Sequence, residues 1–336
     1  MIQKPTKNNV VKNIAKVLLD SDRIMLGSHD KPDGDAVGCL LALQIVLGRH
    51  MGKDVKACVD SVPVSLDFLP GAEHLIEWKQ VAESFVPDVF VALDCGAAFR
   101  LGEGKPFFEE AKAKVNIDHH ASNDYFGDFN YVDVSAAAAG EQVFKLIEEM
   151  GITMDKDAAA CLYAAVATDT GSFRFSNTTA HTHRIAARLH DLGFDFPHLS
   201  QQLFDTRKPE EVKLLADVLG NFSLHHHGQI AVLTITKDML EKYQVEEAEA
   251  ENYAGYARSI DGVRVAVLFK EQKDHLVRVS FRSRDSTDVN EIAALFGGGG
   301  HKKASGSVIK GSLEQAKSKV ICKVAAYLLG GAKDGK

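Results

Sequence analysis

Polar residues that could bind a metal ion occur in four short stretches of the sequence. The first stretch, HDKPDGDAVG, follows the apolar segment RIMLGS and places His29, Asp33 and Asp35 within seven residues. A proline and a glycine between them favour a tight turn that aims alternate side chains at one point. An imidazole and two carboxylates at this spacing suit a divalent cation. Taken alone, the composition also fits an Asp- and Gly-rich surface loop.

The other three stretches end apolar segments in the same way. Asp94 closes the run VFVAL, and Asp118, His119 and His120 close KVNI. Asp169 ends an apolar helix in AVATDTGSF at a glycine turn. Ligands of open α/β sheets gather at the carboxyl ends of the strands, so we expect these residues to converge. Any one aspartate could instead be a helix cap or a turn residue.

The predicted cluster suggests metal-assisted chemistry at phosphorus. Several carboxylates in one crevice repel each other, and two divalent cations are the simplest compensation. Carboxylate and imidazole ligands without thiolate favour Mn²⁺ over Ca²⁺, with Mg²⁺ or Co²⁺ as alternatives. A pair of such ions activates water and stabilises an in-line displacement, which predicts phosphoester hydrolysis. The predicted ligands are His29, Asp33, Asp35, Asp94, His119 and Asp169.

Alternating strands and helices position these stretches in the N-terminal part of the chain. Strands are predicted at 23–28, 54–59, 88–94 and 114–118, and helices dominate from about 140 to 221. This pattern predicts an α/β fold with a mainly parallel, doubly wound sheet. We expect a catalytic domain over 1–207 and a connecting helix over 208–222.

The pattern changes in the remaining residues, 223–336. The runs QIAVLTIT, VRVAVLFK and HLVRVSFRSR alternate with period two, and a helix is predicted over 312–329. We therefore expect a smaller α/β domain with a mixed or antiparallel sheet.

Composition narrows the class of protein. The chain has 336 residues, 45% hydrophobic and 25% charged, and a formal charge of −7, which argues against a protein that coats long nucleic acid. Its five cysteines form no CxxC motif, so neither a disulfide framework nor a cysteine zinc site is expected. The first residues lack an apolar signal core, and no run is long enough to span a bilayer. We expect a cytoplasmic protein without a membrane partner.

These motifs, in this order, resemble those of the DHH phosphoesterases, and FGGGGHKKASG at 296–306 is similar to the signature of the DHH-associated domain. Length places the chain nearest the short-oligoribonuclease (nanoRNase) branch, many members of which dephosphorylate 3′-phosphoadenosine 5′-phosphate. The resemblance implies that His29 and Asp33 bind one metal, that Asp35, His119 and Asp169 chiefly bind the other, and that Asp94 bridges both. It also implies that His120 faces the substrate phosphate and that Asp118 orients its neighbours.

The C-terminal domain carries the predicted substrate contacts. Between residues 258 and 303, nine Lys or Arg stand against six Asp or Glu, which favours an anion-binding face. Arg282 and Arg284 fall on one face of a strand and Ser283 on the other. In the family this domain holds the nucleotide end remote from the scissile bond. The predicted contacts are Arg282, Ser283, Gly299, Gly300 and His301, with Arg100 in the first domain as a phosphate contact or a surface ion pair.

The run SAAAAGEQ at 135–142 departs from the family pattern. Relatives often carry Ser or Thr just before the glutamate, whereas this chain has alanines and Gly140 before Glu141. A hydroxyl that contacts substrate or caps a helix is therefore missing, which leaves substrate preference less defined. The metal positions are unaffected.

The predicted function is a two-metal phosphodiesterase that hydrolyses short oligoribonucleotides to nucleoside 5′-monophosphates and also acts on 3′-phosphoadenosine 5′-phosphate. Alternatives within the enzyme class are hydrolysis of cyclic or linear dinucleotides and, less favoured, of pyrophosphate. From another class, a nucleotide-binding regulatory protein would have lost a metal aspartate, and none is missing. The expected partner is short single-stranded RNA or a small nucleotide rather than long duplex nucleic acid, and a homodimer is left open.

Overall fold

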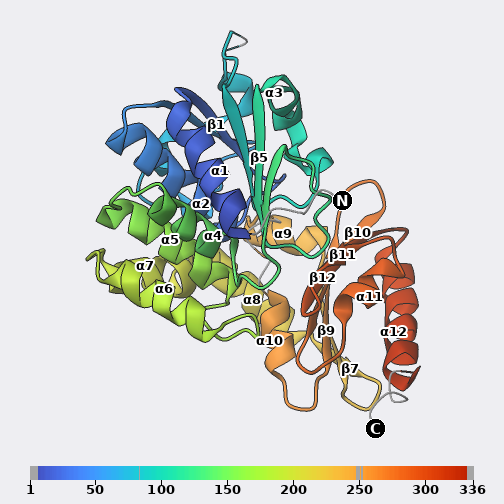
Figure 1. Ribbon diagram of the computed structural model, residues 1–336. Helices are drawn as coiled ribbons and strands as arrows, with labels where there is room; N and C mark the ends of the chain where they lie inside the picture. Colours follow the sequence, from blue (N-terminus) through green and yellow to red (C-terminus); the bar gives the residue numbers. More distant parts are fainter. Residues whose placement is uncertain (1–6, 83, 247–249, 251–252, 331–336) are drawn as a thin grey trace. The chain divides into compact units, whose positions relative to one another are not determined.

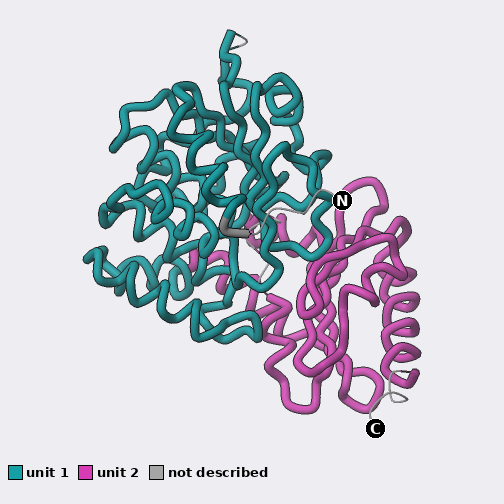
Figure 2. The backbone as a smooth tube through the Cα atoms, in the orientation of Figure 1, with its two compact units in different colours: residues 1–206 teal, residues 207–336 magenta. Residues whose placement is uncertain are grey.

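A computed structural model gives the fold of the chain and describes residues 7–82, 84–246, 250 and 253–330. The chain divides into two compact units, residues 1–206 and 207–336 (Figures 1 and 2). Each unit has its own six-stranded sheet and its own buried apolar clusters.

The first unit is built on a parallel sheet with the strand order β3-β2-β1-β4-β5-β6. Its strands are β1 Arg23–Gly27, β2 Asp54–Val59, β3 Ile76–Glu77, β4 Val89–Leu93, β5 Ala113–Asp118 and β6 Phe129–Val132. The chain builds outward from β1 in one direction and from β4 in the other, so the order reverses between these two neighbours. The predicted doubly wound α/β fold is confirmed, and ligand sites in such sheets lie at this reversal.

Helices cover both faces of this sheet (Figure 1). The helices of this unit are α1 Lys7–Asp20, α2 Gly34–Gln44, α3 Lys105–Glu110, α4 Ala139–Glu149, α5 Lys156–Asp169, α6 Ala180–His190 and α7 Phe196–Ser200, of which α6 and α7 pack against other helices. The larger core lies on the side of α1, α2, α4 and α5, and an aromatic cluster around Trp78 lies on the side of α3. Helices α2 and α5 approach so closely at Gly38 that a Cβ there would lie 2.4 Å from the carbonyl oxygen of Cys161. This close packing brings the ends of α2 and α5 to one place.

The second unit has a mixed sheet with the order β11-β12-β10-β9-β8-β7, in which only β8 and β9 run parallel. Its elements are α8 Pro209–Gly220, β7 Ser223–His225, β8 Ile230–Ile235, α9 Lys237–Tyr243, α10 Ala254–Ser259, β9 Val265–Glu271, β10 Leu276–Ser283, α11 Val289–Ala294, β11 Gly299–Gly300, β12 Ala304–Lys310 and α12 Leu313–Gly330. The predicted mixed or antiparallel sheet is confirmed. Helix α8, expected to connect the domains, contributes Leu214 and Val218 to the core of this unit.

Within the described residues, no helix has the length and apolar character needed to cross a membrane. All five cysteines are free thiols, and four of them are buried.

Candidate functional site

The predicted metal ligands of the first unit lie together at the carboxyl end of its sheet. His29, Asp33 and Asp35 follow β1, and Asp94 follows β4. His119 follows β5, and Asp169 is the last residue of α5. The contacts below join the side chains from all four stretches into one cluster.

Asp94 is at the centre of this cluster. Its Oδ2 lies 3.6 Å from His29 Nε2, and its Oδ1 lies 3.5 Å from both His119 Nε2 and His120 Nδ1. The residue is 2% exposed, and Oδ1 accepts no hydrogen bond from the described residues. Its backbone has a φ of 49°, in the left-handed region that L-residues seldom adopt. An aspartate held in a strained turn with a buried, unsatisfied oxygen is suited to a cation.

Three groups of potential ligand atoms share Asp94; the third consists of Asp94, Asp118 and His120, and the first two contain only predicted metal ligands. The first group is His29, Asp33 and Asp94, and the second is Asp35, Asp94 and His119; in each, the ligand atoms lie within 4.8 Å of one another. Asp169 Oδ2 lies 3.6 Å from His119 Nε2, beside the second group. The donor set is therefore oxygen and imidazole nitrogen, which fits hard or borderline divalent cations.

Backbone carbonyls orient the two histidines of these groups. His29 Nδ1 lies 2.7 Å from the carbonyl oxygen of Asp30, and His119 Nδ1 lies 3.4 Å from that of Ala136. A carbonyl oxygen only accepts, so each Nδ1 carries the proton. Each Nε2 then faces the carboxylates as a potential ligand, which is the usual arrangement around metal-binding histidines.

Helix N-termini hold the two aspartates that follow β1. Asp33 caps α2, because its Oδ1 accepts the N–H groups of Asp35 at 3.0 Å and Ala36 at 3.2 Å. Asp35 accepts the N–H of Ala139 at 2.6 Å and of Gly140 at 2.9 Å, at the start of α4. Helix α4 has no capping side chain of its own. The carboxylate of Asp35 takes that place, so the missing hydroxyl in SAAAAGEQ leaves no uncapped helix end.

The electrostatics of the cluster show how strongly it attracts positive charge. Burial would lower the pKa of His29, but the contact with Asp94 outweighs burial and raises that pKa to about 9. Burial and the charge of Asp94 raise the pKa of Asp35 well above its usual value. Burial, together with the charges of Asp33 and Asp94, raises the pKa of Asp169 to about 7. Where no cation is bound, protons neutralise the negative charge of the carboxylates. Protons and cations therefore compete for this site.

His120 and Asp118 form a hydrogen-bonded pair that adjoins Asp94 in this cluster. His120 Nδ1 lies 2.7 Å from Asp118 Oδ1, and Asp118 is fully buried. The other oxygen of Asp118 accepts a hydrogen bond from Asn123 at 2.6 Å. Asn123, which follows β5, and Asn116, which lies within it, were not predicted as site residues, because a lone asparagine has no characteristic spacing.

Arg100 lies next to the loop that carries His29. Its Nε is 3.4 Å from Asp30 Oδ1, and its carbonyl oxygen accepts the N–H of Asp30 at 2.8 Å. The side chain is about one-third exposed. Arg100 therefore forms an ion pair with Asp30, one of its two predicted roles, and part of its side chain remains exposed to solvent.

In the second unit, the predicted substrate contacts lie at the end of β10 and along β11. Arg282 is half-buried, whereas Ser283 is 2% exposed and lies on the opposite face of the strand, with Phe281 and the core against α11 and α12. The hydroxyl of Ser283 is buried and makes no hydrogen bond to the described residues, and its role as a substrate contact stays a prediction. Gly299 and Gly300 pair with β12 at the edge of the sheet, and the exposed His301 follows them.

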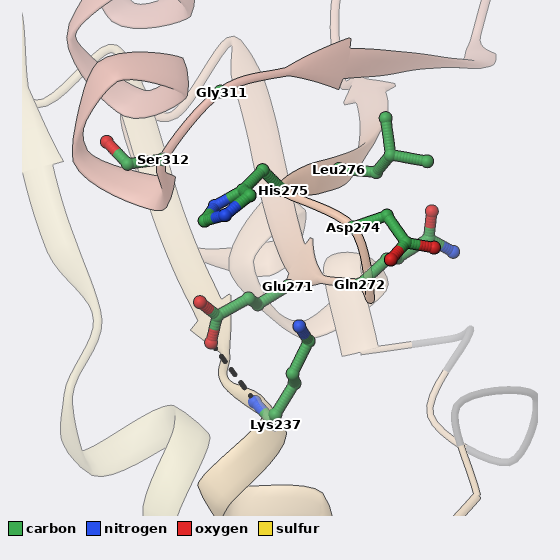
Figure 3. A pocket seen from close by; sticks show the side chains of 8 residues that line it. All are labelled: Lys237, Glu271, Gln272, Asp274, His275, Leu276, Gly311 and Ser312. Carbon is green, nitrogen blue, oxygen red and sulfur yellow. Dashed lines mark hydrogen bonds between the residues drawn. The ribbon is translucent and has the colours of Figure 1, made fainter.

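A separate pocket of about 310 Å³ lies at the other end of β10 (Figure 3). The N–H of Lys237 donates to Glu271 Oε2 at 3.3 Å in its wall. Its lining residues are Lys237, Glu271, Gln272, Asp274, His275, Leu276, Gly311 and Ser312. None of them is a predicted site residue.

Comparison with known proteins identifies the family of this chain. The model of the DHH family, N-terminal domain, matches residues 23–166, and that of the DHHA1 domain matches 227–328. The chain is 34% identical over 300 residues to the bifunctional oligoribonuclease and PAP phosphatase NrnA of Thermus thermophilus, covering 89% of this chain and 88% of the relative. The chain belongs to the DHH family. The predicted resemblance is thus confirmed.

Other DHH relatives show the same coverage. The bifunctional oligoribonuclease and PAP phosphatase NrnA of Bacillus subtilis is 32% identical to this chain, and the match covers 86% of this chain and 90% of the relative. A solved structure of an exopolyphosphatase-related protein from Bacteroides fragilis is 26% identical, with a TM-score of 0.89 over 96% of this chain and 98% of the other. The DHH fold therefore extends through both units of the chain.

Proposed function

We propose that this DHH protein is a divalent-metal-dependent phosphodiesterase that hydrolyses short oligoribonucleotides to nucleoside 5′-monophosphates and also removes the 3′-phosphate of 3′-phosphoadenosine 5′-phosphate. The observation that carries the proposal is the ligand cluster in which Asp94 is common to the group of His29 and Asp33 and to the group of Asp35 and His119. The names of the Thermus and Bacillus relatives support the choice of substrates.

The proposed metal ligands divide between two positions. We assign His29 and Asp33 to one cation and Asp35, His119 and Asp169 to the other, with Asp94 common to both. When bound, two such cations supply Lewis-acid stabilisation of the charge that develops at phosphorus and an activated water. The oxygen-rich ligand set with two imidazoles favours Mn²⁺, with Mg²⁺ or Co²⁺ as alternatives.

The pair of His120 and Asp118 is proposed to act on the substrate rather than on a metal. Asp118 accepts from Nδ1 of His120, so the opposite ring nitrogen, Nε2, is directed away from Asp118. A proton on Nε2 could then stabilise a phosphate oxygen or be transferred to the leaving oxygen. Burial opposes the charged imidazole, but the bond to Asp118 and the charge of Asp94 raise the pKa of His120 overall.

We assign nucleotide binding to cationic and backbone groups of both units. Arg100 in the first unit, and Arg282, Gly299, Gly300 and His301 in the second, are the proposed contacts. Catalysis over 1–207 and substrate binding over 223–336, joined by 208–222, follow the predicted domain boundaries. A single strand of a few nucleotides is the proposed partner, rather than long duplex nucleic acid. A cytoplasmic location belongs to the same proposal, and homodimer formation is left open.

A substrate panel tests the proposed function. Purified full-length protein with Mn²⁺ is incubated with RNAs of two to five nucleotides, a long RNA, 3′-phosphoadenosine 5′-phosphate, linear and cyclic dinucleotides, and pyrophosphate. We expect nucleoside 5′-monophosphates from the short RNAs and inorganic phosphate from 3′-phosphoadenosine 5′-phosphate. Asp94→Asn, which keeps the shape of the side chain, is the control for a contaminating nuclease.

Each alternative has its own outcome in this panel. Turnover confined to cyclic dinucleotides would replace the oligoribonuclease assignment. Binding of nucleotides without turnover of any substrate, with metal demonstrably bound, would favour a regulatory protein instead.

A further inference from the structure

Two asparagines form a buried hydrogen-bonded pair beneath the candidate site. Asn116 lies in β5 and is fully buried, and Asn123 follows the DHH motif and is 8% exposed. Asn123 Nδ2 donates to Asn116 Oδ1 at 2.8 Å and to Asp118 Oδ2 at 2.6 Å. One amide group of Asn123 therefore holds the oxygen of Asp118 that does not face His120.

The same pair reaches the turn that carries Asp94. Asn116 Nδ2 donates to the carbonyl oxygen of Cys95 at 3.0 Å, and Asn123 Nδ2 lies 3.3 Å from the same oxygen. Cys95 directly follows Asp94, whose backbone is in the left-handed region. A conformation of this kind persists only when surrounding contacts hold it. The two amides thus connect the ends of β4 and β5.

The side chain of Asn123 is fixed by the backbone of Tyr125. Its Oδ1 accepts the N–H of Tyr125 at 2.7 Å, so the amide oxygen faces the loop and the amide nitrogen faces Asp118. With both of its amide protons used by Asn116 and Asp118, the side chain has one orientation that satisfies every group.

We propose that Asn123, supported by Asn116, is a positioning residue for the reaction at this site. It keeps Asp118 in the orientation in which Asp118 Oδ1 accepts from His120 Nδ1, and thereby keeps the imidazole directed at the substrate. The inference rests on the proposed function, and neither asparagine touches substrate or metal. Without the amide donor, Asp118 Oδ2 is buried without a partner, and the carboxylate rotates away from His120 to recover one.

Three variants of the full-length protein test this role. Asn123→Ala removes the amide, and Asn123→Asp keeps its shape but replaces the donor by an acceptor. Asn130→Ala is the matched control, because Asn130 also makes two local hydrogen bonds, to Gly127, and neither of them involves Asp118 or Asn123. With the linear dinucleotide pApA, both Asn123 variants should lower kcat roughly ten- to hundredfold, the effect of one hydrogen bond to a charged group. KM and the metal content should stay within about twofold of the Asn130→Ala values.

A spectroscopic measurement separates positioning from general loss of structure. The Nδ1–H of His120 should give a downfield ¹H–¹⁵N resonance in the Mg²⁺-loaded protein, assigned by its absence in His120→Gln. We expect this resonance in the native chain and in Asn130→Ala, and its upfield shift or loss in both Asn123 variants. An unchanged resonance in Asn123→Asp, or a kcat equal to that of the control, would overturn the proposal. If pApA is no substrate but the resonance moves, the positioning stands and the proposed function fails.

Discussion

The contact between Asp35 and the start of α4 can be tested by adding one methyl group. Gly140 donates its N–H to Asp35 Oδ1 at 2.9 Å, and Ala139 donates to Oδ2 at 2.6 Å. A Cβ on residue 140 would lie 2.8 Å from Ala165 Cβ and 3.5 Å from Asp35 Oδ1. Gly140→Ala therefore forces α4 away from α5 at the point where the N–H groups of α4 bind Asp35, a proposed metal ligand.

The size of the effect follows from these distances. Carbon atoms in contact lie about 3.5–4.0 Å apart, so the start of α4 must withdraw by roughly 0.7–1.2 Å. That shift lengthens the two N–H hydrogen bonds to Asp35 to the limit of hydrogen-bond distance or beyond it. Overpacking costs about 1–3 kcal/mol, and a lost bond to a charged group costs about 1.5–3 kcal/mol. With partial relaxation we expect about 2–5 kcal/mol of lost stability, which lowers Tm by about 5–15 °C in a unit of this size.

The assay combines thermal unfolding of the metal-free chain with calorimetric titration of Mn²⁺. Gly140→Ala should lower Tm by this amount and weaken one of two binding events by roughly tenfold or more, because Asp35 is proposed to serve one cation. Gly48→Ala is the control within the same unit, since its nearest contact, Val55 Cβ, would be at 3.8 Å. If Gly140→Ala matches Gly48→Ala in both Tm and Mn²⁺ affinity, α4 does not position Asp35.

Three further predictions concern the cluster and the substrate. Asp94→Asn should abolish turnover and weaken both Mn²⁺ binding events in calorimetry; weakening of only one would show that Asp94 is not shared. Arg282→Ala should raise KM for pApA about tenfold while metal analysis finds unchanged content, and a loss of metal would contradict the assignment to substrate. Because the metal-free pKa of Asp169 is about 7, raised from 3.8, Mn²⁺ must displace its proton below that pH. Mn²⁺ affinity should therefore rise as pH increases from 6 to 8, and equal affinities across that range would contradict the competition.

The strand ends could be predicted because their signal is local. The prediction of 54–59 coincides with β2, and Asp94 directly follows β4 as expected from the run VFVAL. Each such signal lies within a few adjacent residues, where alternation of apolar and polar side chains is informative. The short strands β3 and β6 were not predicted, because two to four residues give too little periodicity.

The contacts that orient the ligands could not be predicted, because they join distant residues through backbone groups. Asp35 and Ala139 are 104 positions apart, and the donors on α4 are N–H groups that every helix start exposes. No sequence pattern identifies Asn123 either, because its role depends on hydrogen bonds to both Asp118 and Asn116. Ser283 shows the converse, because strand alternation placed it on the face opposite Arg282 but could not show that this face is packed against helices.

The position of α5 late in the first unit affects when the metal site can form during synthesis. The last residue of α5 is Asp169, 140 positions after His29, so the proposed ligands span about two thirds of the first unit. A nascent chain on the ribosome cannot assemble both cation positions until α5 has left the exit tunnel. The proposed substrate contacts of the second unit leave the tunnel later still, so we expect turnover of RNA only after both units have been synthesised.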